Sequence, residues 1–409
     1  MKVSKLLTLL CLLCNFSLYA SESHSLEDYL SKYKKEQFKY DYKKNEEESA
    51  KLHDSWIAPI ELSTSYVKSN PYKNEQTNKS AAIKINQPIF QSGGIYYGVK
   101  FATASKKYND YSIDVAKRKM IKDTISILMQ IKQSELGEKS QKLQIKNADI
   151  DMQQKQEQYL NGQLDSGFLD TAILQRNNII EALYDIQTSK ERLISKFRTL
   201  SDLAYNSVTI PHLELIDSGS FLQYNIELSK SRAEIEKNRY KKNITIAKYL
   251  PKINFTAGYN WQKSENQSFQ IGNNIVDTSN ELKYYDYGVR ASIALDINSF
   301  RDIESAKIDY LKSEVSIKDT KRAQEALFEQ VMQNIKNLDK KILLSYENQK
   351  IYKRLQVETQ ELYHAGYKTI YDVDTLKNSY NIQNIKTKIY ELDKQLELLN
   401  LYEMYIDAK

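Results

Sequence analysis

The chain has 409 residues and a formal net charge of +6, with 59 lysines and arginines against 53 aspartates and glutamates. Both signs are interspersed along nearly the whole chain, which argues against the concentrated basic surface of a nucleic-acid-binding protein. Only 11 glycines and 5 prolines are present. Because so few residues favour turns, long uninterrupted elements are expected rather than many small globular units.

The N-terminus has the features of a secretory signal peptide. Lys2 and Lys5 precede an apolar run over residues 6–13, and Ser17-Leu18-Tyr19-Ala20 follows as the cleavage site with small Ala20 at its end. About eight apolar residues are too few for a membrane anchor, since a spanning helix needs about twenty. We therefore predict a signal peptide over residues 1–20, with cleavage after Ala20.

A first structural repeat is predicted over residues 21–207. It consists of a helix, two strands near 59–69 and 81–91, a long helix over 95–162 and a further helix over 166–205. Pro59 ends the first helix and starts the first strand. At about 1.5 Å per residue, the long helix would extend for roughly 95 Å, which no single globular core requires.

A crossover over residues 208–220 separates this repeat from a second one. Pro211 and the polar residues 217–220 interrupt the helical pattern there. The second repeat, residues 221–409, is predicted to contain a helix, two strands near 252–262 and 284–297, a long helix over 300–365 and a last helix over 369–407.

The two repeats share sequence as well as element order. Residues 60–66 align with residues 253–259, each segment following a proline closely. Within the long helices, matching residues recur at one constant spacing, and the helix end 159–162 recurs at the same spacing as 363–366. Gly162 and Gly366 are therefore predicted to be helix C-caps. A register held over several elements indicates an internal duplication.

The strand segments show the alternation of a membrane-exposed sheet. One face of the third strand and one face of the fourth are apolar: Ile253, Phe255, Ala257, Tyr259 and Trp261, then Tyr287, Val289, Ala291, Ile293 and Leu295. About ten residues suit a tilted transmembrane strand, and the aromatic residues gather toward one end. Polar loops are expected over 70–80 and 263–283. A half-buried hairpin in a soluble subdomain is the alternative.

Four strands cannot close a barrel by themselves, so several chains would have to contribute. Three copies give twelve strands. The predicted fold class is therefore mainly helical with transmembrane strands, in which long coiled hairpins form a tube and four strands per chain join a trimeric barrel.

No enzymatic site is predicted. The four histidines are scattered along the chain, and Cys11 and Cys14 both lie in the predicted signal peptide, so the mature chain should carry neither a disulfide nor a lipid. The Gly93-Gly94 pair is not followed by the Lys-Ser/Thr of a phosphate-binding loop. The sequence therefore predicts no catalytic residue, no metal site and no cofactor.

Several motifs taken together resemble the TolC family of outer-membrane efflux and secretion channels. They are the strand starts after Pro59 and Pro251, the strand-to-helix junction over residues 87–94, and the Tyr-x-x-Gly helix ends at Gly162 and Gly366. The resemblance covers essentially the whole mature chain. It implies a passive homotrimeric channel in the outer-membrane lipid, with a long periplasmic extension and no role for nucleic acid.

The same resemblance implies partners and a gate. A periplasmic adaptor, or membrane fusion protein, would join the channel to an inner-membrane transporter in a tripartite efflux pump or a type I secretion system. The two glycine turns would form the periplasmic entrance. Position by position, the family pattern places pore or gate roles on five residues: Tyr363, Lys368, Asp372, Asp374 and Asp170. Asp374 stands beside the family's second carboxylate position, and Asp170 aligns only if two residues are inserted after Gly162.

Two alternatives stay open at this point. Thr369 and Asp372 also fit a helix capping box, so Asp372 has a structural role available besides a pore-facing one. The whole chain could instead be a soluble periplasmic coiled-coil adaptor or structural protein. Two helical hairpins in tandem and the lack of an inner-membrane anchor favour the channel.

Overall fold

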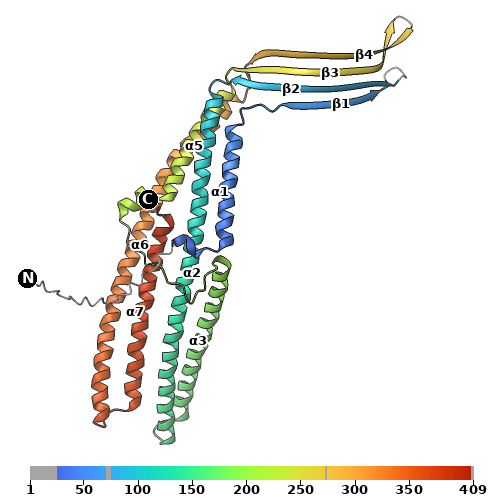
Figure 1. Cartoon of the computed structure of the whole chain (residues 1–409). Helices are drawn as coiled ribbons and strands as arrows, with labels where there is room; N and C mark the ends of the chain where they lie inside the picture. Colours follow the sequence, from blue (N-terminus) through green and yellow to red (C-terminus); the bar gives the residue numbers. More distant parts are fainter. Residues whose placement is uncertain (1–24, 71–74, 272–273, 407–409) are drawn as a thin grey trace, which may run out of the picture.

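The computed structural model describes residues 25–70, 75–271 and 274–406, which form a long helical rod with a four-stranded sheet at one end (Figure 1). The predicted signal peptide, with its cleavage site and both cysteines, lies outside the described residues. None of the helices in the described ranges combines the length and apolarity needed to cross a membrane.

The first repeat contains three long helices and two strands: α1 (Lys32–His53), β1 (Glu61–Ser69), β2 (Gln76–Phe90), α2 (Gly94–Leu160) and α3 (Ser166–Leu200). A short 3-10 helix, η1 (Leu26–Tyr29), precedes them. The side chain of Ser31 caps α1 by accepting a hydrogen bond from the amide of Lys34. At its 67 residues, α2 is about 100 Å long.

The second repeat follows the same order: α4 (Ser218–Gln223), α5 (Ile226–Lys248), β3 (Lys252–Ile271), β4 (Asn274–Ser292), α6 (Ser299–His364) and α7 (Ile370–Met404). Its helices match those of the first repeat in length, with 23 residues in α5 against 22 in α1, 66 in α6 against 67 in α2, and 35 in both α7 and α3. The predicted tandem halves are confirmed.

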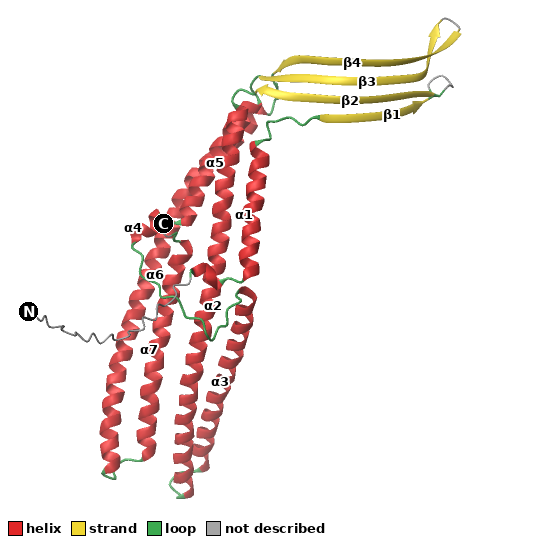
Figure 2. Ribbon diagram, in the orientation of Figure 1, coloured by secondary structure: helices red, strands yellow, loops and turns green. Residues whose placement is uncertain are grey.

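The helices form a single curved wall rather than a closed bundle (Figure 2). Away from the sheet, α2 packs against α3 and α7, and α7 packs against α6. Nearer the sheet, α2 packs against α1 and α5, and α5 packs against α6. The wall is thus bordered by α3 and α1 on one side and by α6 on the other.

The main apolar core lies midway along the rod, where η1, α2, α3, α7 and the segment between the repeats meet. Its fully buried side chains include Phe197, Phe221, Leu128 and Leu401. The last helix of the first repeat ends at Leu200 rather than near residue 205. Because α3 ends there, residues 201–217 have no regular secondary structure, and they cross the core, to which Leu213 and Ile216 contribute.

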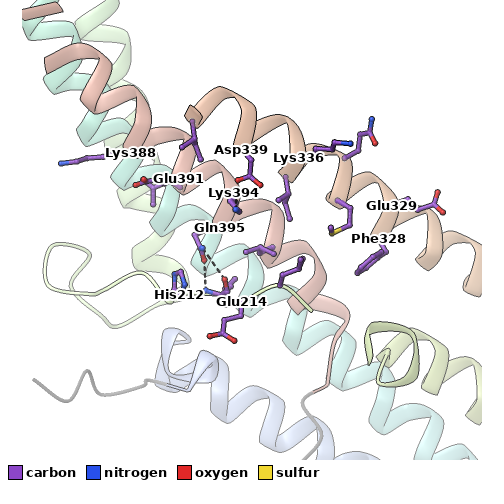
Figure 3. A pocket seen from close by; sticks show the side chains of 18 of the residues that line it. His212, Glu214, Phe328, Glu329, Lys336, Asp339, Lys388, Glu391, Lys394 and Gln395 are labelled. Carbon is purple, nitrogen blue, oxygen red and sulfur yellow. Dashed lines mark hydrogen bonds and ion pairs between the residues drawn. The ribbon is translucent and has the colours of Figure 1, made fainter. Parts of the chain in front are cut away.

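Residues 217–220 do not break the helical pattern as predicted, because they begin a helix. The Asp217 carboxylate accepts a hydrogen bond of 3.0 Å from the Ser220 amide and so caps α4. The amide of Leu213 donates to Gln395 Oε1 at 2.8 Å, which fastens the irregular segment to α7. Beside this contact lies a groove of about 1500 Å³ between α6 and α7, lined by lysines as well as by aspartate and glutamate side chains (Figure 3).

The four strands form one antiparallel sheet in the order β1-β2-β3-β4. The predicted polar loops over 70–80 and 263–283 are largely wrong, because residues 76–80, 263–271 and 274–283 are strand. These polar residues continue the backbone ladder and pair across it, as in the contact between Lys79 and Glu265 at 3.1 Å. At the other end β4 stops at Ser292, so Ile293 and Leu295 lie beyond the sheet.

The β3–β4 hairpin is longer than the β1–β2 hairpin. The pairing of β2 with β3 ends at Thr77 and Glu265, whereas β3 and β4 stay paired up to Ile271 and Asn274. A bulge between Ser264 and Gln267 introduces a bend, so the hairpin leaves the plane of the sheet (Figure 1). The two repeats therefore differ most at this end of the molecule.

Candidate channel entrance

Both long helices end in the same glycine turn at the end of the rod far from the sheet. Gly162 has φ +71° and Gly366 has φ +79°, a left-handed conformation that glycine adopts without steric cost. The amide of Gln163 bonds to the carbonyl of Gln158 at 2.9 Å, and the amide of Tyr367 bonds to the carbonyl of Leu362 at 2.8 Å. These are the bonds of a Schellman cap, so the predicted role of both glycines as C-caps agrees with the geometry.

The helix that follows each turn has its own N-cap. Asp165 caps α3 by accepting from the amide of Gly167 at 2.8 Å, and Thr369 caps α7. Both connections are equally long, from Leu160 to the start of α3 and from His364 to the start of α7. The two extra residues expected after Gly162 are absent, because both glycines lead into a cap three residues later.

The equal turns change the correspondence between the repeats. With the glycines and caps aligned, Asp170 of α3 corresponds to Asp374 of α7, while Asp372 corresponds to Phe168. Asp170 is exposed and Asp374 is half-buried. The first repeat thus carries Asp165 at the cap and Asp170 inside the helix, whereas the second repeat carries Thr369 at the cap and both Asp372 and Asp374 inside the helix.

Asp372 forms the capping box that the sequence predicts. Its carboxylate accepts hydrogen bonds from the Thr369 amide at 3.0 Å and from the Thr369 hydroxyl at 2.9 Å. These bonds favour the charged form and hold the pKa of Asp372 below its usual value. The contribution of this cap to stability is therefore fully present above about pH 4 and is lost as the pH falls through the lowered pKa.

The remaining predicted gate residues also lie at this end. Tyr363 is 37% exposed on the last turn of α6, with its ring 5.6 Å from that of His364, and Lys368 is exposed in the connection to α7. The structure thus gathers Tyr363, Lys368, Asp372 and Asp374 on one turn and leaves Asp170 on the other.

The hydrogen bond that joins the two turns involves residues that sequence reasoning missed. The Tyr371 hydroxyl donates to Glu157 Oε1 at 3.0 Å, from the first turn of α7 to the last turn of α2. This bond raises the pKa of Tyr371. The two residues are far apart in the chain, and the only available signal was their equal distance from the two glycine turns.

Further along the wall, the same pair of helices is held by neutral and charged contacts. Asn378 Nδ2 donates to Asn147 Oδ1 at 2.8 Å, and Gln133 Nε2 donates to Asp393 Oδ1 at 2.7 Å. Each contact joins α7 to α2. The Tyr371–Glu157 bond is therefore the outermost in a series that keeps the two hairpins side by side.

At the opposite end, the register of the strands separates an outer face from an inner face. The outer face is defined by the apolar side of β3 and by the residues paired with it, such as Ala257 with Ile85 and Tyr287. From the helices out to Tyr66 on β1, Ala81 on β2, Trp261 on β3 and Tyr285 on β4, this face is uncharged in the described strands. The uncharged band includes Leu62, Thr64, Tyr66, Ala81, Ile83, Ile85, Ile253, Phe255, Ala257, Tyr259, Trp261, Tyr285, Tyr287, Val289 and Ala291.

The inner face is polar and internally hydrogen-bonded. Asn254 Nδ2 donates to Asn86 Oδ1 at 2.9 Å, and Asn260 Nδ2 donates to Asp286 Oδ1 at 2.8 Å. Glu61 and Lys84 are register partners on the same face. An apolar face with aromatic residues at one end, opposite a polar face, is the pattern of a sheet between lipid and water.

Comparison with known proteins agrees with this architecture. Residues 218–405, which make up most of the second repeat, match the family model described as Outer membrane efflux protein. The second repeat therefore has the sequence pattern of an outer-membrane efflux protein. The resemblance noted from Pro59, Pro251 and the two glycine turns is thereby confirmed, and the family is one of transport channels rather than enzymes.

Solved structures of outer-membrane channels have the same fold over almost the full chain. VceC from Vibrio cholerae has a TM-score of 0.69 at 14% identity, covering 91% of this chain and 93% of VceC. CmeC from Campylobacter jejuni has a TM-score of 0.71 at 12% identity, covering 92% and 84%. The open state of MtrE from Neisseria gonorrhoeae has a TM-score of 0.61 at 10% identity, covering 92% and 86%. A search of curated proteins found no match.

Proposed function

We propose that three copies of this chain close into a passive channel that leads from the periplasm through the outer membrane. The observation that carries this proposal is that a single copy is open along both sides. The strands β1 and β4 each have only one neighbour in the sheet, and the helical wall ends at α3 and α1 on one side and at α6 on the other. Unpaired strand edges have to be covered in a stable protein.

The open sides are apolar as well as unpaired. On α6, Ile308, Leu311 and Val315 follow helical spacing and are 55%, 45% and 64% exposed. On the opposite border, Tyr33 and Tyr40 of α1 are 75% and 61% exposed. Because the two borders differ, a copy joins its neighbour head to tail, and such an interface generates a ring when the rotation closes.

Three copies would bring twelve strands together, with the outer face toward lipid and the inner face toward the pore. Eight residue steps on β3, from Ile253 to Trp261, extend for about 26 Å along the strand, or about 20 Å across the membrane at a tilt of about 40°. This is close to the band of about 25 Å that membrane barrels present. The helical wall would then extend into the periplasm.

We place the gate at the glycine turns. In a closed ring the turns of three copies meet around the axis, and Asp372 and Asp374 of each copy would supply carboxylates to the entrance. Tyr363 and Lys368 would contact the neighbouring copy across the opening, and Asp170 would take the position equivalent to Asp374 on the first turn. Negative charge in a narrow opening favours cations.

The bond between Tyr371 and Glu157 holds the second hairpin against the first within one copy. We expect Tyr371→Phe to raise the open probability of channels reconstituted in planar bilayers, because it removes the hydrogen bond between α7 and α2 at the turns. Glu157→Gln should have a smaller effect and should add little to Tyr371→Phe. Tyr367→Phe, also on the second turn, is the matched control. If channels of both variants stay as closed as the wild type, the Tyr371–Glu157 bond does not hold the entrance closed.

The partners of the channel follow from the same placement. A periplasmic adaptor and an inner-membrane transporter would supply the energy that a passive conduit lacks, in an efflux pump or a type I secretion system. The competing view, a soluble periplasmic coiled-coil protein, predicts recovery in the soluble fraction as a species whose mobility on a gel does not change with heating. The uncharged outer face of the sheet favours the membrane.

A further inference from the structure

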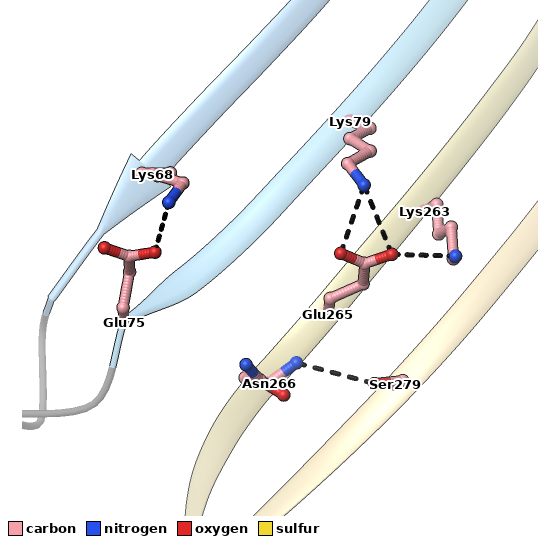
Figure 4. A network of polar contacts seen from close by, with 7 residues as sticks. All are labelled: Lys68, Glu75, Lys79, Lys263, Glu265, Asn266 and Ser279. Atoms are coloured by element: carbon pink, nitrogen blue, oxygen red, sulfur yellow. Dashed lines mark hydrogen bonds and ion pairs between the residues drawn. The ribbon is translucent and has the colours of Figure 1, made fainter.

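Each strand of the sheet carries a lysine at the first outer-face position beyond the uncharged band. These four lysines, Lys68 of β1, Lys79 of β2, Lys263 of β3 and Lys283 of β4, are called the lysine belt. Figure 4 shows three of these lysines, Lys68, Lys79 and Lys263, with the carboxylates that they contact. The belt lies at the end of the sheet away from the helices, where Lys79 is the register partner of Tyr66 and Lys283 that of Trp261.

The positions of the belt lysines follow a line across the sheet. Lys79 and Lys263 are register partners. Lys283 is paired with Trp261, one outer-face position closer to the helices, and Lys68 is paired with Thr77, one position farther away. Strands in a barrel are tilted, so a plane across the barrel crosses successive strands at positions that shift in one direction. In a closed barrel whose tilt follows this shift, the lysine belt would lie at one membrane depth.

Three glutamates hold the belt lysines in place without neutralising them all. Glu265 contacts Lys263 at 2.7 Å and Lys79 at 3.1 Å, so one carboxylate serves two ammonium groups. Glu281 contacts Lys283 at 2.9 Å and accepts a hydrogen bond of 3.0 Å from Trp261 Nε1. Glu75 pairs with Lys68.

The ammonium groups retain donors for a further partner. Each lysine has three N–H donors, and a single carboxylate contact uses one of them. The side chains of Lys68 and Lys283 are 49% and 60% exposed, and those of Lys79 and Lys263 are 36% and 39% exposed. The belt thus presents oriented cationic donors at the level where an apolar surface gives way to a charged one.

We propose that the lysine belt binds the phosphate groups of an anionic lipid headgroup in the outer leaflet. The acyl chains of that lipid would lie along the uncharged outer face, and the aromatic residues would lie at the level of its headgroup. Charge complementarity and continuity with the apolar band select a phosphorylated lipid over a soluble anion. This inference rests on the proposed placement of the sheet in the membrane.

The test uses trimers of the full mature chain, reconstituted into phosphatidylcholine vesicles that contain either diphosphorylated lipid A or its dephosphorylated form. EDTA excludes bridging by divalent cations. The lipid retained per trimer is measured by native mass spectrometry. We expect the wild type to retain the phosphorylated form in preference. In the variant K68Q/K79Q/K263Q/K283Q that preference should fall at least about tenfold, because the basic groups that would attract the phosphates are removed.

Two further variants control for folding and for charge. The first combines the four Lys→Gln changes with E75Q/E265Q/E281Q, which leaves no unpaired carboxylate, and it should also lose the preference. Lys84→Gln, on the inner face, should keep it. A lysine-free belt that retains the phosphorylated lipid as well as the wild type, or inserted wild-type trimers that show no preference, would overturn the proposal alone. Trimers that never enter vesicles would defeat the proposed function itself.

Discussion

Ala257→Lys is expected to prevent stable insertion of the trimer, whereas Thr256→Lys one residue earlier is expected to be tolerated. Ala257 lies in the middle of the uncharged band on β3, between Ile85 and Tyr287. A lysine near the bilayer midplane costs about 2 to 4 kcal/mol on the lipid face of a barrel. In a trimer the change is present three times, so the total cost is comparable to the stability of many proteins.

The control works because the two side chains point to opposite faces. Thr256 lies on the polar inner face, where its hydroxyl is near the carbonyl of Gly288 at 3.4 Å. A lysine there would extend into the water-filled interior. Ala257→Leu adds bulk without charge and should insert as the wild type does. The measurement is the heat-modifiable trimer recovered in the outer-membrane fraction, and an equal yield for both lysine variants would contradict the assignment of faces.

Asp372→Asn is expected to weaken block of the channel by a trivalent cation at least about tenfold. Two unit charges about 4 Å apart interact by about 1 kcal/mol in water and by more in a confined pore, and three copies of Asp372 would act on one bound ion. Asparagine retains a side-chain oxygen that can accept from the Thr369 amide, so the capping box is largely preserved while the charge is removed.

Asp374→Asn and Asp170→Asn provide the comparison for that experiment. The two residues occupy equivalent positions on the two turns, and Asp170 is the more exposed of them. We expect both changes to reduce the block less than Asp372→Asn does. If Asp372→Asn leaves cation block and selectivity unchanged, then its role is confined to the helix cap.

Several element boundaries could be predicted well from the sequence, because local rules fix them. Pro251 and the alternation that follows mark the start of β3, and the left-handed conformation needed at Gly366 marks the end of α6. The capping box at Thr369 and Asp372 also depends only on near neighbours in the chain.

The sequence was less informative where partners distant in the chain decide the structure. The polar stretch that follows Trp261 has the composition of a loop. It remains in the sheet because its residues pair with the neighbouring strand, as in the ion pair between Glu265 and Lys79. The bond between Tyr371 and Glu157 depends in the same way on the packing of α7 against α2.

The gate illustrates the limit of transferring a pattern position by position. Matching Asp170 to a bonding partner required an insertion after Gly162, but the caps at Asp165 and Thr369 leave no room for one. The difference between the repeats therefore lies in side chains on turns of equal length, and not in the length of the turns. In the proposed trimer, Phe168 in the position that corresponds to Asp372 would make the entrance threefold rather than sixfold.

Disulfide crosslinking between β1 and β4 tests the ring most directly. The two strands border the sheet on opposite sides, about 14 Å apart across two intervening strands, so a disulfide between them within one copy is not possible. Thr64→Cys would be combined in turn with Tyr285→Cys, Tyr287→Cys and Val289→Cys, in a mature chain expected to have no other cysteine. A closed ring predicts covalent dimers and trimers in at least one register and no larger species. Monomers in every register, or a ladder that continues beyond three copies, would contradict it.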